Sequence, residues 1–132
     1  MNFSNKLIDW YNSNKRDLPW RRTKDPYKIW VSEIILQQTR IEQGEKYYHK
    51  FLKKYPNITS LANTNNDELL KIWEGLGYYS RALNMLKTAV IVVDKYQGIF
   101  PSTYNELIDL PGIGDYTASA ISSICKNEVK PV

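Results

Sequence analysis

The sequence predicts an all-helical bundle, and three observations support that prediction. Apolar residues recur three and four positions apart, the spacing of a helix, along most of the 132-residue chain. Stretches of alternating apolar and polar residues between Gly or Asn turns, which are typical of β-hairpins, are missing. No internal repeat, low-complexity tract or flexible linker divides the chain. We therefore expect one helical domain, which suits this length.

The first two predicted helices are separated by a basic loop. The N-terminal helix covers residues 2–14, within an N-terminal segment of residues 1–15, and its apolar face consists of Phe3, Leu7, Trp10 and Tyr11. The loop, residues 16–26, contains two prolines. The second helix is predicted at residues 26–38, because Asp25 can cap its first turn and Pro26 fits the first helical position.

The remaining predicted helices follow at short intervals. They cover residues 40–55, 66–73, 79–96, 103–110 and 116–125, with a shorter helical turn at residues 58–62. In the helix over residues 79–96 the predicted core-facing residues are Ala82, Leu86, Ala89, Val90 and Val93. In the helix over residues 40–55 the residues expected on a solvated face are Lys46, Lys50, Lys53 and Lys54. Residues 25–127 are thus expected to form a six-helix domain.

The composition of the chain indicates which compartment and which partners to expect. The 18 Lys and Arg residues exceed the 14 Asp and Glu residues and give a net charge of +4, which favours a polyanionic partner. Cys125 is the only cysteine, so these residues can form neither an internal disulfide nor a thiolate-rich metal cluster, and we expect a buried, inert thiol. The chain has no run of eighteen uncharged apolar residues and no secretory signal pattern at its start, so we expect a cytoplasmic protein without a membrane partner.

The segment Leu110-Pro111-Gly112-Ile113-Gly114 lies between two short predicted helices and matches a helix-hairpin-helix turn, residues 110–116. Glycines permit a tight turn and let backbone N–H groups approach a DNA phosphate, and the next helix presents its positive dipole end. Such contacts bind DNA without reading its sequence. We therefore predict a phosphate-binding hairpin formed by Pro111, Gly112, Ile113 and Gly114, with Ile113 anchored in the core. The plain alternative is a connector whose glycines only turn the chain.

Glu33 lies on the most apolar predicted helix. Its neighbours on the helical wheel are Ile29, Trp30 and Leu36, so its carboxyl group is expected to meet little water. Desolvation favours the protonated form, and a carboxylic acid that is protonated near neutral pH can donate its proton to a leaving group. Glu33 is therefore our candidate general acid. The alternative is a structural glutamate paired with Arg16, Arg21, Arg22 or Arg40.

Four separated motifs precede the hairpin. They are Arg16-Asp17-Leu18-Pro19-Trp20-Arg21, Asp25-Pro26-Tyr27, Trp30-Val31-Ser32-Glu33-Ile34-Ile35-Leu36-Gln37-Gln38-Thr39-Arg40 and Trp73-Glu74-Gly75-Leu76-Gly77-Tyr78-Tyr79-Ser80-Arg81. With these motifs in this order, the chain resembles A/G-specific adenine DNA glycosylases of the endonuclease III superfamily over essentially its whole length. The resemblance implies an all-α bundle of the helix-hairpin-helix DNA glycosylase type, of which this chain is the N-terminal portion.

The resemblance implies a role in base excision DNA repair. Its partner would be double-stranded DNA in which adenine is mispaired with 8-oxoguanine or guanine, and the adenine would be flipped out of the duplex. In the implied scheme Glu33 protonates N7 of the adenine, the sugar passes through an oxocarbenium-like state, and water adds at the anomeric carbon. Glu33 is also implied to position that water.

The resemblance also assigns contacts to residues around Glu33. The residues implied to line the adenine pocket are Arg16, Trp20 and Leu36. The residues implied to contact the DNA are Gln38 and Tyr78, which would insert into the base stack, and Thr39 and Leu76, which would lie near 8-oxoguanine. The plain alternative makes Gln38 a solvated helix-end residue and gives Trp20, Leu36 and Tyr78 ordinary packing roles.

Tyr116 stands where strand-cutting members of the superfamily place a Schiff-base lysine, so the resemblance implies a monofunctional glycosylase. Three alternatives stay open from the sequence. The chain could be a non-catalytic helix-hairpin-helix DNA-binding module, an endonuclease III-like glycosylase with lyase activity, or a purely structural helical protein.

Several parts implied by the resemblance lie beyond Val132. They are an aspartate that stabilises the positive charge on the sugar, four cysteines that hold a [4Fe–4S] cluster, and a C-terminal domain that recognises 8-oxoguanine. Cys125 cannot replace the cluster cysteines. We therefore expect a truncated chain without a cofactor, which catalyses poorly or not at all by itself.

Overall fold

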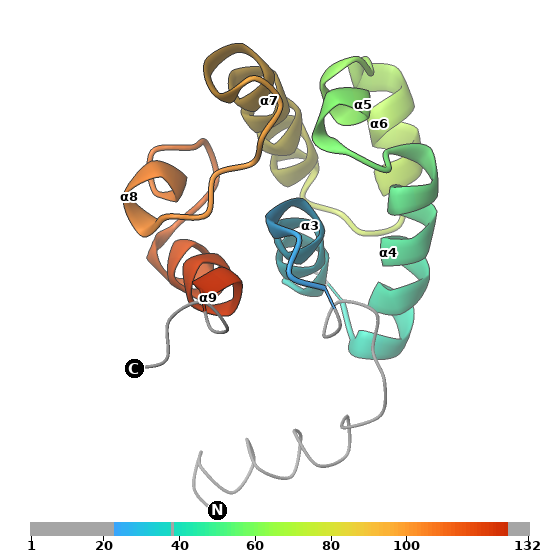
Figure 1. Ribbon diagram of the computed structural model, residues 1–132. Coiled ribbons are helices and arrows are strands. Elements are labelled where there is room, and N and C mark those ends of the chain that lie inside the picture. The colour runs from blue at the N-terminus through green and yellow to red at the C-terminus, as the bar shows by residue number, and fades with distance from the viewer. Residues whose placement is uncertain (1–22, 38, 127–132) are drawn as a thin grey trace, which may run out of the picture.

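The computed structural model describes residues 23–37 and 39–126, and within these ranges it contains helices and no strands (Figure 1). The helices are α3 (Pro26–Leu36), α4 (Ile41–Lys54), α5 (Ile58–Ala62), α6 (Asn66–Trp73), α7 (Tyr79–Tyr96), α8 (Tyr104–Leu107) and α9 (Asp115–Lys126). The predicted all-helical fold is confirmed. The predicted N-terminal helix at residues 2–14 lies outside the described residues.

Helix α3 lies in the middle of the bundle, between α4 and α9 (Figure 1). It begins as predicted, with Pro26 in its first turn and the Asp25 carboxylate accepting a 2.9 Å hydrogen bond from the Tyr27 N–H. Seven of its eleven residues are buried, so apolar side chains do surround most of the helix. It ends at Leu36 rather than at the predicted residue 38.

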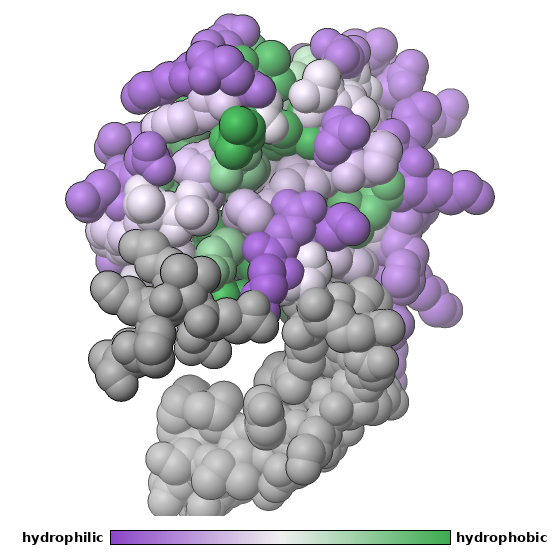
Figure 2. All heavy atoms as spheres, in the orientation of Figure 1, coloured by the Kyte–Doolittle hydropathy of each residue, from purple (hydrophilic) through white to green (hydrophobic). Residues whose placement is uncertain are grey.

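Helix α4 separates an apolar face from a charged one. The side chains of Tyr48 and Phe51 are buried, whereas the four lysines predicted to be solvated are exposed, along the hydrophilic edge of the molecule that α4 forms in Figure 2. The end of α4 is fixed by Tyr55, whose backbone carbonyl accepts a 2.7 Å hydrogen bond from the Tyr27 hydroxyl. Two segments that are distant in sequence are thereby joined at the base of α3.

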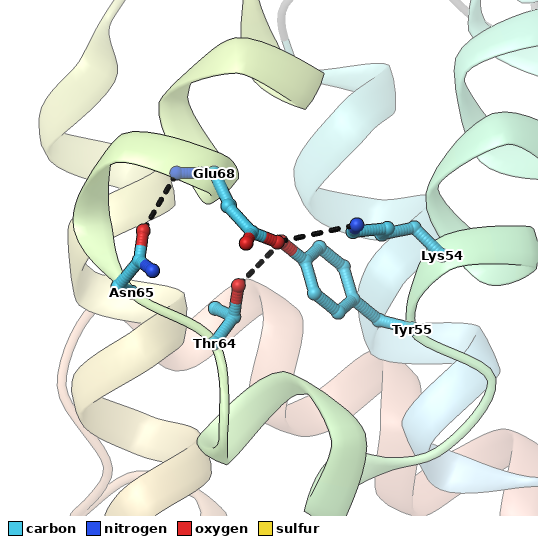
Figure 3. Close-up of polar contacts among 5 residues, drawn as sticks. All are labelled: Lys54, Tyr55, Thr64, Asn65 and Glu68. Carbon is cyan, nitrogen blue, oxygen red and sulfur yellow. Dashed lines mark hydrogen bonds and ion pairs between the residues drawn. The ribbon is translucent and has the colours of Figure 1, made fainter.

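The C-terminal end of α4 also meets the beginning of α6 (Figure 3). The hydroxyl groups of Tyr55 and Thr64 lie 2.8 Å apart, and the Asn65 side chain caps α6 by accepting a 2.8 Å hydrogen bond from the Glu68 N–H. The Glu68 carboxylate lies 3.2 Å from the Lys54 ammonium group. Because this ion pair is exposed, it contributes at most about 1 kcal/mol, and the buried ring of Tyr55 contributes more to the junction.

Helix α7 has the predicted bounds, but the predicted core-facing residues were partly wrong. Its buried residues are Ala82, Met85, Thr88, Ala89 and Val92. Leu86 and Val93 are only half-buried, and Val90 is 42% exposed. The face of α7 that packs against α5 and α6 includes Thr88 instead of Val90, and the buried Thr88 hydroxyl donates a 2.8 Å hydrogen bond to the backbone carbonyl of Pro111.

The predicted bounds of the last two helices were also wrong. Helix α8 stops at Leu107 instead of residue 110, because a residue that precedes proline, here Leu110, is disfavoured in the helical conformation. Helix α9 begins at Asp115 instead of residue 116, and the Gly114 carbonyl accepts a 2.9 Å hydrogen bond from the Ala118 N–H in its first turn. Over the described ranges, no helix is both long enough and apolar enough to cross a membrane.

The burial pattern of α7 can be tested by making the same substitution, valine to alanine, at one buried and one exposed position. Val92→Ala should lower the free energy of unfolding by about 2 kcal/mol, because it removes buried methyl groups from the core. Val90→Ala should change it by less than about 0.5 kcal/mol, because that side chain is largely solvated. Urea denaturation measures both, and a larger loss for Val90→Ala would contradict the burial pattern.

Candidate active site and nucleic-acid interface

Glu33 lies on α3 with its side chain half-buried. Burial raises the pKa of its carboxyl group above the ordinary value of 4.5. Among the described residues it has no hydrogen-bond partner and no ion-pair partner, and the exposed Arg40 does not pair with it. The other three arginines of the structural alternative lie outside the described residues. The geometry therefore offers a carboxyl group that is partly desolvated and carries a proton more readily than a solvated one.

The segment after α3 is held by contacts to two other helices. The Gln37 side-chain amide lies 3.5 Å from the Thr117 hydroxyl on α9, and Thr39 hydrogen-bonds to Gln43 on α4. Leu36 is half-buried and packs so closely on α4 that a Cβ atom on Gly44 would lie 3.0 Å from its Cδ2 atom. Predicted site residues Leu36 and Thr39 are thus placed together at the α3–α4 corner.

Residues 74–78, which we call the wedge loop, connect α6 to α7. Its predicted DNA-contacting residues differ in exposure: Tyr78 is 73% exposed, whereas Leu76 is only 8% exposed. Tyr78 has a φ of 49°, in the left-handed region that residues other than glycine adopt infrequently, and it precedes the first residue of α7. The loop therefore presents an aromatic ring to solvent at the start of a helix, and this conformation requires support from neighbouring residues.

Two side-chain hydrogen bonds supply that support. The Tyr47 hydroxyl donates to the Glu74 carbonyl at 2.9 Å, and the Trp73 indole N–H donates to the Gly77 carbonyl at 2.9 Å. Gly75 has a φ of 99°, and a Cβ atom there would lie 2.2 Å from the Tyr47 hydroxyl. Glycine is favoured at this position, because a φ of 99° strains any other residue and a Cβ atom would displace the Tyr47 hydroxyl from its bond to Glu74.

The hairpin predicted at residues 110–116 is a turn between α8 and α9. Ile113 is buried, as predicted, and Leu110 is buried beside it, whereas Gly112 and Gly114 are exposed. Gly112 has a φ of 78°, and a Cβ atom there would lie 3.1 Å from the Cβ atom of Asn84 on α7. The turn is therefore anchored by apolar side chains on one side and leaves its glycine backbone accessible on the other.

The start of α9 carries two exposed side chains. The Asp115 carboxylate accepts a hydrogen bond from the Tyr104 hydroxyl, which links α8 to α9 across the hairpin and raises the pKa of Tyr104. Tyr116, which the resemblance places at the lyase-lysine position, is 75% exposed. Arg16, Trp20 and Gln38 lie outside the described residues, so their predicted roles stay predictions.

The structure brings three predicted segments to one pocket of about 310 Å³. Tyr78 of the wedge loop, Gly112 of the hairpin and Trp30 of α3 all line it, but Glu33 does not. Sequence reasoning missed the residues that hold these segments together, which are Tyr47 and Thr88. The sequence carried little signal for Thr88, because apolarity favours Val90 at the core and the partner of the Thr88 hydroxyl, the Pro111 carbonyl, is distant in sequence.

The described residues contain no group of three or more His, Cys, Asp or Glu side chains that could hold a metal ion. The thiol of Cys125 is half-buried rather than buried, and desolvation raises its pKa. One thiol does not fit a cluster that needs four cysteine ligands.

Comparison with known proteins agrees with this geometry. Residues 31–129 match the family described as HhH-GPD superfamily base excision DNA repair protein. The adenine DNA glycosylase of Buchnera aphidicola subsp. Baizongia pistaciae (strain Bp) is 49% identical over 122 residues, which are 92% of this chain and 35% of that protein. The adenine DNA glycosylase of Homo sapiens is 41% identical over 131 residues, which are 92% of this chain and 24% of that protein. The chain thus spans about a third or less of these relatives.

Solved structures have the same fold. A thermostable thymine-DNA glycosylase superposes with a TM-score of 0.80 and 32% sequence identity, over 95% of this chain and 58% of that one. Endonuclease III in a non-covalent complex with DNA superposes with a TM-score of 0.72 over 91% of this chain and 56% of that one, and at 22% identity this similarity concerns the fold alone. The predicted resemblance is confirmed at the level of the family: this chain belongs to the HhH-GPD superfamily of base excision DNA repair proteins.

Proposed function

We propose that this chain is part of an adenine-removing DNA glycosylase. In this proposal the chain contains the general acid and binds the DNA phosphate backbone. The observation on which the proposal rests is Glu33, a partly desolvated carboxyl group with a raised pKa and no partner among the described residues. Relatives that are 40–49% identical to this chain are adenine DNA glycosylases, which supports adenine as the base.

Glu33 acts by donating its proton to N7 of a flipped adenine. Protonation turns the base into a better leaving group, so the N-glycosidic bond breaks as positive charge develops on the sugar. Water then adds at the anomeric carbon, and its proton leaves to solvent or to the Glu33 carboxylate. A second carboxylate that stabilises the sugar cation is not assigned to any of these 132 residues.

The wedge loop and the hairpin hold the duplex while the base is out of the stack. Gln38 inserts into the stack beside the flipped adenine, Tyr78 inserts its exposed ring on the other strand, and Thr39 and Leu76 lie near the base opposite the adenine. Because Leu76 is almost fully buried, its contact with DNA requires the wedge loop to open. The exposed Gly112 and Gly114 present backbone N–H groups to a phosphate.

The substrate in this proposal is double-stranded DNA with adenine opposite 8-oxoguanine or guanine, and the proposed place of action is the cytoplasm. Tyr116 cannot form a Schiff base, which favours hydrolysis without strand cleavage. Arg16, Trp20 and Leu36 line the adenine pocket. A [4Fe–4S] cluster would need cysteines other than Cys125, the one cysteine of this chain, and no step described above involves such a cluster.

Glu33→Gln tests the acid directly in the product of the complete reading frame. The amide keeps the shape of the side chain but has no transferable proton, so single-turnover release of adenine from an A:8-oxoguanine duplex should fall by about a hundredfold or more, whereas duplex binding should persist. Glu42→Gln is the matched control, because Glu42 is exposed on α4. Near-normal release by Glu33→Gln would rule out the proposed acid.

The protonation of Glu33 also predicts a pH-dependent difference in stability. The folded state binds this proton more tightly than the unfolded chain, so wild-type protein loses stability as pH rises from 4.5 through the raised pKa. Glu33→Gln should therefore be more stable than wild type at about pH 8 and equally stable at about pH 4. Urea denaturation at both pH values checks this, with Glu42→Gln as control. Equal stability at both pH values would show that the Glu33 carboxyl is not desolvated.

A further inference from the structure

The pocket of about 310 Å³ between α7, α3 and the hairpin contains hydrogen-bond donors that the protein does not use. We call it the α7 pocket, and the polar side chains that line it are Ser80, Arg81 and Asn84. In the described part of the chain, none of the three forms a side-chain hydrogen bond or an ion pair. Arg81 lies only against the Tyr78 ring, at 5.8 Å from its centroid.

The chemistry of this pocket suits an anion. Arg81 is half-buried in the wall, and no acidic residue is among the described residues that line the pocket. Trp30, Ile34 and Met85 contribute apolar surface, which strengthens the attraction between a guanidinium group and a bound anion. A guanidinium group presents two parallel N–H donors that match the oxygens of a phosphate. The volume is about ten times the roughly 30 Å³ that one water molecule occupies in the liquid.

The position of the pocket identifies the source of the anion. Tyr78 of the wedge loop and Gly112 of the hairpin both line the pocket, so DNA that contacts both segments lies next to it. We propose that the α7 pocket binds one backbone phosphodiester of the DNA, held by the Arg81 guanidinium with Ser80 and Asn84 as further donors. This proposal rests on the proposed function, because it requires a bound duplex.

Arg81→Met and a control at the other end of α7 test the proposal. Arg81→Met should weaken binding of an A:8-oxoguanine duplex by about tenfold or more and lower the slope of log affinity against log salt by about 0.9, the value for one lost phosphate contact. Arg81→Lys should keep the slope, because it keeps the charge. Lys95→Met removes a charge about 21 Å further along the helix and should leave the slope unchanged. Thermal melting confirms that the variants fold.

A duplex scan then locates the phosphate. Methylphosphonate substitution neutralises one phosphate at a time, and one position should weaken wild-type binding but leave Arg81→Met binding unaffected. The effect of Arg81→Met should also persist in a Tyr78→Leu background. Loss of the effect in that background would show that Arg81 only positions the Tyr78 ring and would overturn the proposal.

The remaining outcomes separate failure of the pocket from failure of the proposed function. If wild type binds the duplex and Arg81→Met has the same slope of log affinity against log salt, the pocket assignment is wrong and the proposed function stands. If wild type does not bind the duplex, both are wrong. In a further outcome, inorganic phosphate shifts the Arg81 side-chain NMR signals, but no methylphosphonate in the duplex scan weakens wild-type binding. The pocket would then bind a free anion, and the DNA assignment would be overturned.

Discussion

The rest of the structure depends on one constraint, which is that α3 has almost no side that faces water. A helix with seven buried residues out of eleven must be covered on most sides, and α4 and α9 provide that cover. The Tyr27 hydroxyl ties the start of α3 to the end of α4, and Gln37 connects its other end to α9. Glu33 sits in this setting, so the packing that stabilises the bundle is also what raises the pKa of its carboxyl group.

Helix α7 relates the two proposed DNA contacts to each other. The wedge loop leads into its first turn, and Thr88, ten residues after Tyr78 and thus about 15 Å along the axis, holds the hairpin through the Pro111 carbonyl. Because one continuous helix spans both contacts, their separation does not depend on a flexible connection. The unused donors of Ser80, Arg81 and Asn84 lie between Tyr78 and Thr88 along this helix.

Local signals predicted the helices well and their orientation less well. The bounds of α6 and α7 were predicted correctly because Asn65 caps one helix and Gly98, with a φ of 80°, follows the other. Burial on α7 was predicted from apolarity, which favours Val90 over Thr88. The observed burial is the reverse, because α7 packs on α5 and α6 with a different face, and a carbonyl more than twenty residues away satisfies the buried Thr88 hydroxyl. Glu33 was recognisable from its apolar neighbours. The hydrogen bond from the Tyr47 hydroxyl to the wedge loop was not, because it joins α4 to a loop that is distant in sequence and no local pattern indicates it.

The central claim is that Glu33 is an acid whose proton is retained by desolvation, and the most direct measurement is the titration of that one carboxyl group. NMR detection of the Glu33 side-chain carboxyl carbon as a function of pH, assigned by comparison with Glu33→Gln, gives its pKa without reference to activity. A pKa clearly above 4.5 is the predicted result. A pKa at or below 4.5 would contradict the claim, because the group would then be ionised at neutral pH as readily as any solvated glutamate.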